Sequence, residues 1–140
     1  NANDLEQKLQ YYETVQRLFE NSKKAGIGDE LDLINNGLAS STTTNSKEFN
    51  KLPIIAKAYQ DFAKKLIALN VPSELARYHL SIANNSHNTG IAVQNMKEII
   101  NDPLIGLGGL SQYQKYSEDL VKDVDDLENA LLQDNDTIIE

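Results

Sequence analysis

A chain of 140 residues that has no cysteine and a formal net charge of −8 excludes several classes of protein at the outset. At this length a single domain, covering residues 1–140, can bury roughly 70% of the surface of its extended chain, so its core needs neither disulfides nor thiolate metal sites. Nucleic acids and anionic lipids attract clustered Lys and Arg, so this acidic chain argues against both as partners.

Apolar residues spaced for one helical face predict a first helix over residues 3–24. Gly26 and Gly28 follow it directly and are expected to end it. A short extra helical turn should come next and stop before Gly37. Residues 39–46 contain only small or polar side chains, so ordering them would cost conformational entropy with little burial in return. We expect these residues to form a mobile loop after the first helix.

The clearest helical pattern predicts a second helix over residues 50–69. Its apolar positions alternate by three and four: Leu52, Ile55, Tyr59, Phe62, Leu66 and Leu69. Pro72 opens a third helix over residues 72–100, and Pro103 lies in the first turn of a fourth over residues 103–133. Links as short as these favour antiparallel neighbours. The sequence therefore predicts an all-α fold, an antiparallel four-helix bundle.

The predicted centre of this bundle is small and polar. Residues equidistant from the turns should face one another, which brings together His79, Ser86, Thr89, Tyr113 and Ser117. One interpretation is structural: Gly90 makes room for the Tyr113 ring, the two serines bond to carbonyls four residues earlier, and His79 is a neutral core residue. On this interpretation His79→Leu changes stability by less than about 1.5 kcal/mol. The alternative is a small cavity lined by those five residues, in which a modest ligand binds.

Three glycines interrupt an apolar run at the start of the fourth helix: Gly106, Gly108 and Gly109. Each interior glycine costs about 0.8 to 1 kcal/mol relative to alanine, so a compensating gain is expected. Close approach of a neighbouring backbone is the structural explanation, and a mobile lid or a partner's docking surface is the functional one. The run lacks the lysine of a phosphate-binding loop and follows no strand, so a nucleotide site is not expected.

Residue types for catalysis or metal binding do not gather in this sequence. His79 and His87 are eight positions apart, about 12 Å along a helix, which is too far to share one metal ion. Neither follows an acidic residue at the spacing of di-iron bundles. No serine or threonine lies in a known nucleophile motif. We expect no enzyme activity, no cofactor and no metal site.

The net charge is concentrated near the carboxyl end. Residues 118–140 hold nine acidic side chains and only Lys122, whereas residues 1–117 hold 12 acidic and 12 basic side chains. The acidic positions lack the glycine and the terminal glutamate of a calcium-binding loop. We expect a solvated acidic face, available to a basic partner, on a helix end that frays because negative charge there opposes the helix dipole.

One stretch of the chain resembles a known family. The motif Tyr78-His79-Leu80, and the segment from Asp102-Pro103 to Ser111-Gln112-Tyr113-Gln114, are similar to an uncharacterised family of exported or membrane-tethered helical proteins from small-genome uncultivated bacteria. The resemblance covers roughly residues 50 to 130. It implies an ectodomain outside the cytoplasmic membrane, and it implies no activity.

These observations favour a non-enzymatic, extracytoplasmic interaction or scaffold module with an unidentified protein partner. The alternative is a ligand-sensing four-helix-bundle domain whose pocket is the polar centre. No stretch reaches the ~20 apolar residues of a membrane span, so this segment should not insert directly. The chain begins at Asn1 rather than at methionine, so we expect a signal peptide or an anchor upstream; a cytoplasmic location stays open.

Overall fold

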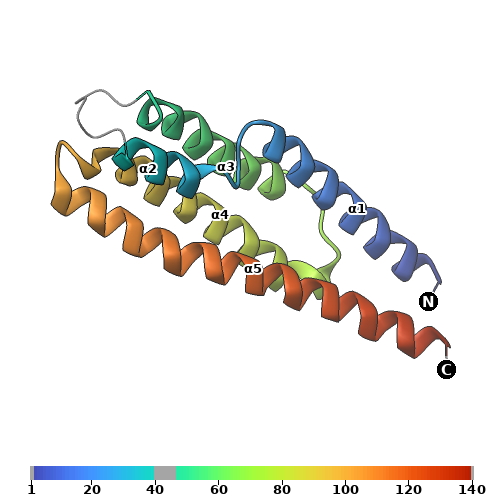
Figure 1. The fold of residues 1–140 in the computed structure, drawn as a ribbon. Coiled ribbons are helices and arrows are strands. Elements are labelled where there is room, and N and C mark those ends of the chain that lie inside the picture. Colours follow the sequence, from blue (N-terminus) through green and yellow to red (C-terminus); the bar gives the residue numbers. More distant parts are fainter. Residues whose placement is uncertain (1, 40–46, 140) are drawn as a thin grey trace.

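The computed structural model describes the backbone of residues 2–39 and 47–139, and the side chains of residues 3–39 and 47–133. Within these ranges the chain is all-helical, with five α-helices and no strand. They are α1 (Ala2–Lys24), α2 (Glu30–Ala39), α3 (Leu52–Ile67), α4 (Ala76–Met96) and α5 (Pro103–Ile139), with 3-10 turns at Phe49–Lys51, Ser73–Leu75 and Lys97–Ile99. Figure 1 shows an elongated helical bundle in which α1 begins and α5 ends at the same end of the molecule.

The segment after α1 differs most from its expected form. α2 is a helix of 10 residues rather than a single turn, and Gly37 lies inside it. A Cβ on Gly37 would lie 2.7 Å from the Phe49 ring, so this glycine admits an aromatic side chain and does not end the helix. Ala39, expected to begin a loop, is the last residue of α2. The rest of the predicted mobile loop, residues 40–46, lies outside the described residues.

The three later helices lie where the sequence predicts them, and they differ from the prediction only at their ends. The expected second helix begins with a 3-10 turn at Phe49, and the expected third helix has a 3-10 turn at each end. α5 continues to Ile139 instead of ending near residue 133. The sequence after Gln133 contains neither glycine nor proline, so no residue there breaks the helix.

α1 ends in a turn that requires glycine. Gly26 has a φ of +111°, a conformation that side chains with a Cβ rarely adopt. Its N–H donates to the carbonyl of Lys23 at 2.9 Å, and the N–H of Ile27 donates to the carbonyl of Ser22 at 3.3 Å. These two bonds form a Schellman motif, and the Ile27 side chain that follows it is buried. The motif turns the chain directly into α2.

α4 lies between α3 and α5 and packs closely on both. A Cβ on Gly90 would lie 2.8 Å from the carbonyl oxygen of Ala56, so this glycine lets the α3 backbone approach α4. The expectation that Gly90 makes room for the Tyr113 ring was wrong, because the atoms nearest to the missing Cβ all belong to α3.

The glycine run of α5 has two members that allow close approach and one that does not. A Cβ on Gly106 would lie 2.2 Å from the Cα of Ile99, and one on Gly109 would lie 2.8 Å from the backbone nitrogen of Met96. A Cβ on Gly108 would meet nothing within 4 Å. Backbone approach is therefore confirmed for Gly106 and Gly109 and is wrong for Gly108.

α1 is the least tightly held of the long helices. It makes far fewer contacts with α3 and α5 than α4 does. Polar contacts fix its first half: Lys8 pairs with Glu74, and the Tyr11 hydroxyl lies beside His79. None of the helices, as far as they are described, is both long enough and apolar enough to cross a membrane.

Candidate functional site

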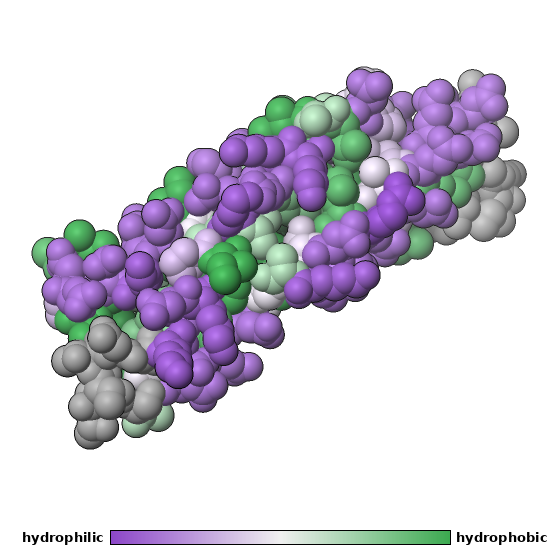
Figure 2. All heavy atoms as spheres, turned by 90° about the horizontal axis from the view of Figure 1, so that it is seen from above, coloured by the Kyte–Doolittle hydropathy of each residue, from purple (hydrophilic) through white to green (hydrophobic). Residues whose placement is uncertain are grey.

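The space between α1 and α5 is a cleft with a volume of about 920 Å³. Its floor is formed by side chains of α3 and α4, principally Tyr59, Phe62 and Ile82. One wall is a face of α1, and the other is the length of α5 from Tyr113 to Glu128. Figure 2 shows apolar side chains exposed between hydrophilic ridges on one face of the molecule. The weak packing of α1 against α5 is what leaves this space open.

The α1 wall follows directly from helical periodicity. Its lining residues recur every three or four positions: Tyr12, Val15, Gln16, Phe19, Glu20 and Lys23. The eleven steps from Tyr12 to Lys23 correspond to a cleft about 16 Å long. At one end the Tyr12 hydroxyl donates to Glu128 at 2.7 Å and so bridges the two walls. The loop through Gly28 lies at the other end.

Glu30 lies at the inner end of the cleft and is fully buried. The hydroxyls of Tyr59 and Tyr113 both donate to its Oε1, at 2.5 Å and 2.8 Å. Its Oε2 accepts the backbone N–H of Gly28 at 2.8 Å. Gly28 has a φ of +106°, so glycine is needed to aim that N–H at the carboxylate. Three helices and one loop thus converge on a single carboxyl group.

The two tyrosines are held in their neutral forms by this arrangement. Burial, and next the negative charge of Glu30, raise the pKa of Tyr59 and of Tyr113 well above the ordinary value for a phenol. Both hydroxyls therefore act as hydrogen-bond donors to Glu30 and keep lone pairs free to accept another donor. Across the described part of the chain, no Lys, Arg or His side chain pairs with Glu30.

The rim of the cleft is acidic. It carries Glu20, Glu118, Asp125 and Glu128, and the only basic side chain among the residues that line the cleft is Lys23. Lys23 is itself engaged, because its Nζ lies 3.4 Å from Glu20. Together with Glu30, the lining therefore holds five acidic groups and one basic group, which favours a positively charged occupant.

The five residues predicted to line a central pocket do not share one site. Tyr113 and Ser117 line the cleft between α1 and α5. His79, Ser86 and Thr89 are buried elsewhere, and they line neither this cleft nor a second hollow of about 430 Å³ between α1 and the link from α3 to α4. Each of the three has a hydrogen-bond partner inside the protein.

The partners of these buried residues correct several details of the structural interpretation. Ser86 donates to the carbonyl of Tyr59 on α3 at 2.8 Å, and not to its own helix. Thr89 does donate within α4, to Asn85 at 2.6 Å. The partner of His79 is distant in sequence, because its Nδ1 lies 2.6 Å from the Tyr11 hydroxyl.

The serine in the cleft also differs from expectation. Ser117 contacts the carbonyl three residues earlier, that of Gln114, at 3.4 Å, rather than the carbonyl four residues earlier.

Equal spacing from a turn centred on Val71 predicts that His79 faces Phe62, but the register between α3 and α4 differs from this prediction. The His79 ring is hydrogen-bonded to the backbone of Leu66, one helical turn beyond Phe62 on α3. Ser86 likewise meets Tyr59, where a turn centred on Val71 would have placed Ile82. The link contains an extended residue at Pro72, with φ −55° and ψ 135°, followed by a 3-10 turn. This asymmetric link displaces α4 along α3 by about one turn.

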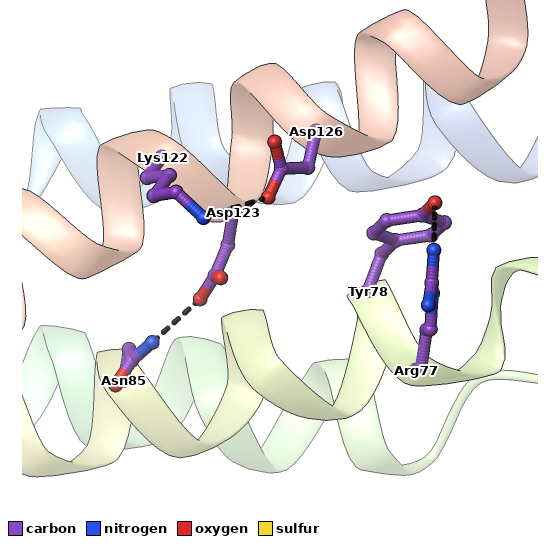
Figure 3. Close-up of polar contacts among 6 residues, drawn as sticks. All are labelled: Arg77, Tyr78, Asn85, Lys122, Asp123 and Asp126. Atoms are coloured by element: carbon purple, nitrogen blue, oxygen red, sulfur yellow. Dashed lines mark hydrogen bonds and ion pairs between the residues drawn. The ribbon is translucent and has the colours of Figure 1, made fainter.

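The acidic face of α5 is more engaged than the sequence suggested. Asn85 of α4 donates to Asp123 at 2.5 Å, and Lys122 lies 3.5 Å from Asp126 (Figure 3). Glu128 accepts the Tyr12 hydroxyl. Asp123 and Glu128 join α5 to α4 and α1, so the description of this face as merely solvated was wrong for these two residues, whereas the Lys122–Asp126 pair lies within α5. Among the described side chains, no group of three or more His, Cys, Asp or Glu could hold a metal ion.

Sequence reasoning missed Glu30, the central residue of the site. Its position after Gly28 and Asp29 resembles an ordinary first-turn acidic residue of a helix. The available signal was the tyrosines: Tyr59 and Tyr113 lie on apolar helical faces, and a buried phenol needs a hydrogen-bond partner. That requirement predicts a buried acceptor without identifying it.

Comparisons with protein-family models, curated proteins and solved structures find no match to this chain. The resemblance of residues 50 to 130 to exported helical proteins therefore stays a prediction.

Proposed function

We propose that this chain is a non-enzymatic binding module, an antiparallel four-helix bundle of α1, α3, α4 and α5, that holds a small apolar molecule between α1 and α5. The observation that carries this proposal is the cleft itself, with a floor of apolar and aromatic side chains and polar groups gathered at its inner end. This is the ligand-sensing alternative, with the binding site moved from the bundle centre to the edge of α1.

The size and chemistry of the cleft support a small-molecule ligand. Ligand pockets commonly have volumes of roughly 300 to 1,000 Å³, are lined mainly by apolar and aromatic groups, and contain a few placed polar groups. The cleft of about 920 Å³ meets each condition. None of the residues that line it is a histidine, and Ser117 contacts its own helix, so the lining supports binding rather than group transfer.

A neutral probe tests the proposal. We expect 4-phenylbutanol to bind wild-type protein saturably in calorimetry and to raise its unfolding temperature. Val121→Trp places a large ring at the rim of the cleft and should weaken this binding about tenfold or more. Leu132→Trp is the matched control, because Leu132 is similarly exposed on α5 and lies outside the cleft.

Two results would contradict the proposed function. One is the absence of saturable binding of 4-phenylbutanol to the wild type. The other is equal binding by the Val121→Trp and Leu132→Trp variants, which would move the probe away from the cleft.

An interaction or scaffold role is a second candidate, favoured by exposed apolar side chains at the start of α5. Leu104 is 85% exposed and Leu107, one turn later, is 57% exposed. Such a pair supports a protein partner, including a second copy of this chain. Sedimentation velocity tests the second copy: wild type should associate as its concentration rises, and the Leu104→Ser, Leu107→Ser double variant should stay monomeric. A monomeric wild type at every concentration would contradict self-association.

An extracytoplasmic location is part of the proposal and rests on the resemblance to exported proteins. The chain has no cysteine, so Ser111→Cys would introduce a single exposed thiol into the described helices. In intact source cells that express the complete protein, a membrane-impermeant maleimide should label this thiol. Labelling only after lysis would place the module inside the cell.

A further inference from the structure

We propose that the cleft is selective for a hydrophobic amine, whose protonated nitrogen lies beside the hydroxyls of Tyr59 and Tyr113 at Glu30 and whose apolar body lies along α1 and α5. This inference rests on the proposed ligand-binding function and names the class of ligand.

The inner end of the cleft has a negative group with no cationic side chain beside it among the described residues. Glu30 is fully buried and receives three hydrogen bonds, all from neutral donors. These bonds and the amino end of α2 stabilise the carboxylate through partial charges only, and a buried carboxylate without a full opposite charge is unfavourable. A ligand that brings a cation to this position would gain the interaction that the described residues leave unmade.

The hydroxyl groups offer the nitrogen a direct contact. Each phenol donates its hydrogen to Glu30 and can accept an N–H from the ligand on its oxygen. The ammonium group can therefore bind beside the carboxylate without displacing either tyrosine. Four aromatic side chains line the cleft, and aromatic rings attract a cation to their faces rather than an anion: Phe19, Tyr59, Phe62 and Tyr113.

The acidic rim selects the same charge at longer range. Four rim carboxylates and one lysine give the mouth of the cleft a negative potential, which attracts cations and opposes carboxylate ligands such as fatty acids. The mouth and the inner end of the cleft therefore both favour a positively charged ligand. An apolar ligand with an anionic head would meet repulsion at both places.

The shape of the cleft favours a small molecule over a basic peptide helix. The Tyr12–Glu128 hydrogen bond crosses from α1 to α5 at one end, and the Gly28 loop lies at the other. A docked helix would have to continue past one of these ends. A molecule shorter than about 16 Å fits between them.

Three matched probes test the selectivity on the unmodified chain: 4-phenylbutylamine, 4-phenylbutanol and 5-phenylpentanoate. The three share one apolar body and differ in their head groups. By calorimetry, we expect the amine to bind about tenfold more tightly than the alcohol, and the carboxylate to bind most weakly. This comparison needs no variant, so it stays valid whatever a substitution does to folding.

Glu30→Gln tests the assigned residue. Glutamine keeps an acceptor for the tyrosines and removes the charge, so we expect the amine to lose about tenfold in affinity while the alcohol changes by less than about twofold. Glu13→Gln makes the same change in charge on an exposed side chain of α1 outside the cleft and should leave both affinities unchanged. Circular dichroism and thermal unfolding verify that each variant is folded.

The outcomes separate the two proposals. If amine and alcohol bind wild type equally, selectivity for amines is wrong and the apolar cleft remains a binding site. If Glu30→Gln is folded and binds the amine as tightly as wild type, Glu30 is not the site of the nitrogen. If none of the three probes binds, the proposed function fails and this inference fails with it.

Discussion

The Tyr11 hydroxyl and the Nδ1 of His79 lie 2.6 Å apart, and their contact joins α1 to α4 across 68 positions of sequence. Both side chains are buried, and their ring centroids are 5.5 Å apart. This contact is one of the few that fix the first half of α1. It changes what a substitution at His79 should do, because an apolar residue there would strand a buried phenol.

We therefore expect His79→Leu to lower the free energy of unfolding by about 1 to 3 kcal/mol, the usual cost of an unsatisfied buried polar group. An apolar pocket around His79 would have made this change nearly neutral. Urea denaturation measures the loss. In a Tyr11→Phe background the same substitution should cost less, since no hydroxyl is left without a partner; equal costs in both backgrounds would show that the pair is not coupled.

The same histidine should make stability depend on pH. Burial lowers the pKa of His79 below its ordinary value of 6.5, against a smaller opposite effect of a backbone hydrogen bond with Leu66. As pH falls below about 6.5 the unfolded chain takes up the proton first, so stability is lost from that pH downward until the folded state is also protonated.

The unfolding free energies of wild type and His79→Leu are compared from about pH 8 to pH 5. Their difference separates the contribution of His79 to the pH dependence from that of the carboxylates. We expect the stability advantage of wild type to shrink as the solution is acidified. Imidazole NMR signals provide a direct titration, with the exposed His87 of the same helix as the internal comparison. A His79 signal that titrates above pH 6.5 would contradict the expected sign.

The glycines of α5 should respond in opposite directions to alanine. Gly108→Ala should stabilise the protein by about 0.8 to 1 kcal/mol, because its Cβ meets no neighbour and helix propensity improves. Gly106→Ala and Gly109→Ala should destabilise it by about 1 to 3 kcal/mol, because the new methyl groups would overlap the Ile99 and Met96 backbones. Thermal and urea unfolding of the three variants measure this, and a loss of stability in Gly108→Ala would contradict the open space around its Cβ.

The tyrosines that bind Glu30 should be coupled. Tyr59→Phe or Tyr113→Phe alone removes one donor from Oε1, and we expect each to cost about 1.5 to 3 kcal/mol. The double variant should cost more than the two single losses together, since Oε1 would then lose both of its donors. A double-mutant cycle in urea measures the coupling, and simple additivity would mean that another group satisfies the carboxylate.

Hydrogen exchange should identify α1 as the first helix to open. Its contacts with α3 and α5 are few, whereas α4 is packed on both sides. We expect amides of α1 to exchange faster than those of α4 in the free protein. Saturating 4-phenylbutylamine should slow exchange in α1 more than in α4; equal slowing throughout would indicate that the amine stabilises the molecule without using the cleft.

The sequence predicted the parts of this fold that depend on local pattern. The apolar stripe from Leu52 to Leu66 lies in α3 and is buried, because a period of three and four leaves only a helix that can bury it. Close backbone approach was predicted for all three glycines of α5, and it holds for Gly106 and Gly109 but not for Gly108. The register between α3 and α4 could not be obtained this way, because it depends on one extended residue, Pro72.

The cleft lay beyond prediction for a different reason. It exists because α1 packs only loosely against α5, and loose packing has no signature in the periodicity of either helix. Glu30 was missed because its partners come from α3, α5 and the Gly28 loop, three segments whose convergence is visible only in the fold.

The close packing of α4 against α3 and α5 depends on Gly90, Gly106 and Gly109, and none of these lines the cleft. The α1 wall of the cleft takes no part in this packing. The close helix packing and the α1 wall of the cleft thus depend on different residues, and selection can act on each separately. Substitutions on one face of α1 could alter the range of ligands over generations while the frame behind it stays intact, and the same division gives a protein engineer a single helix to vary.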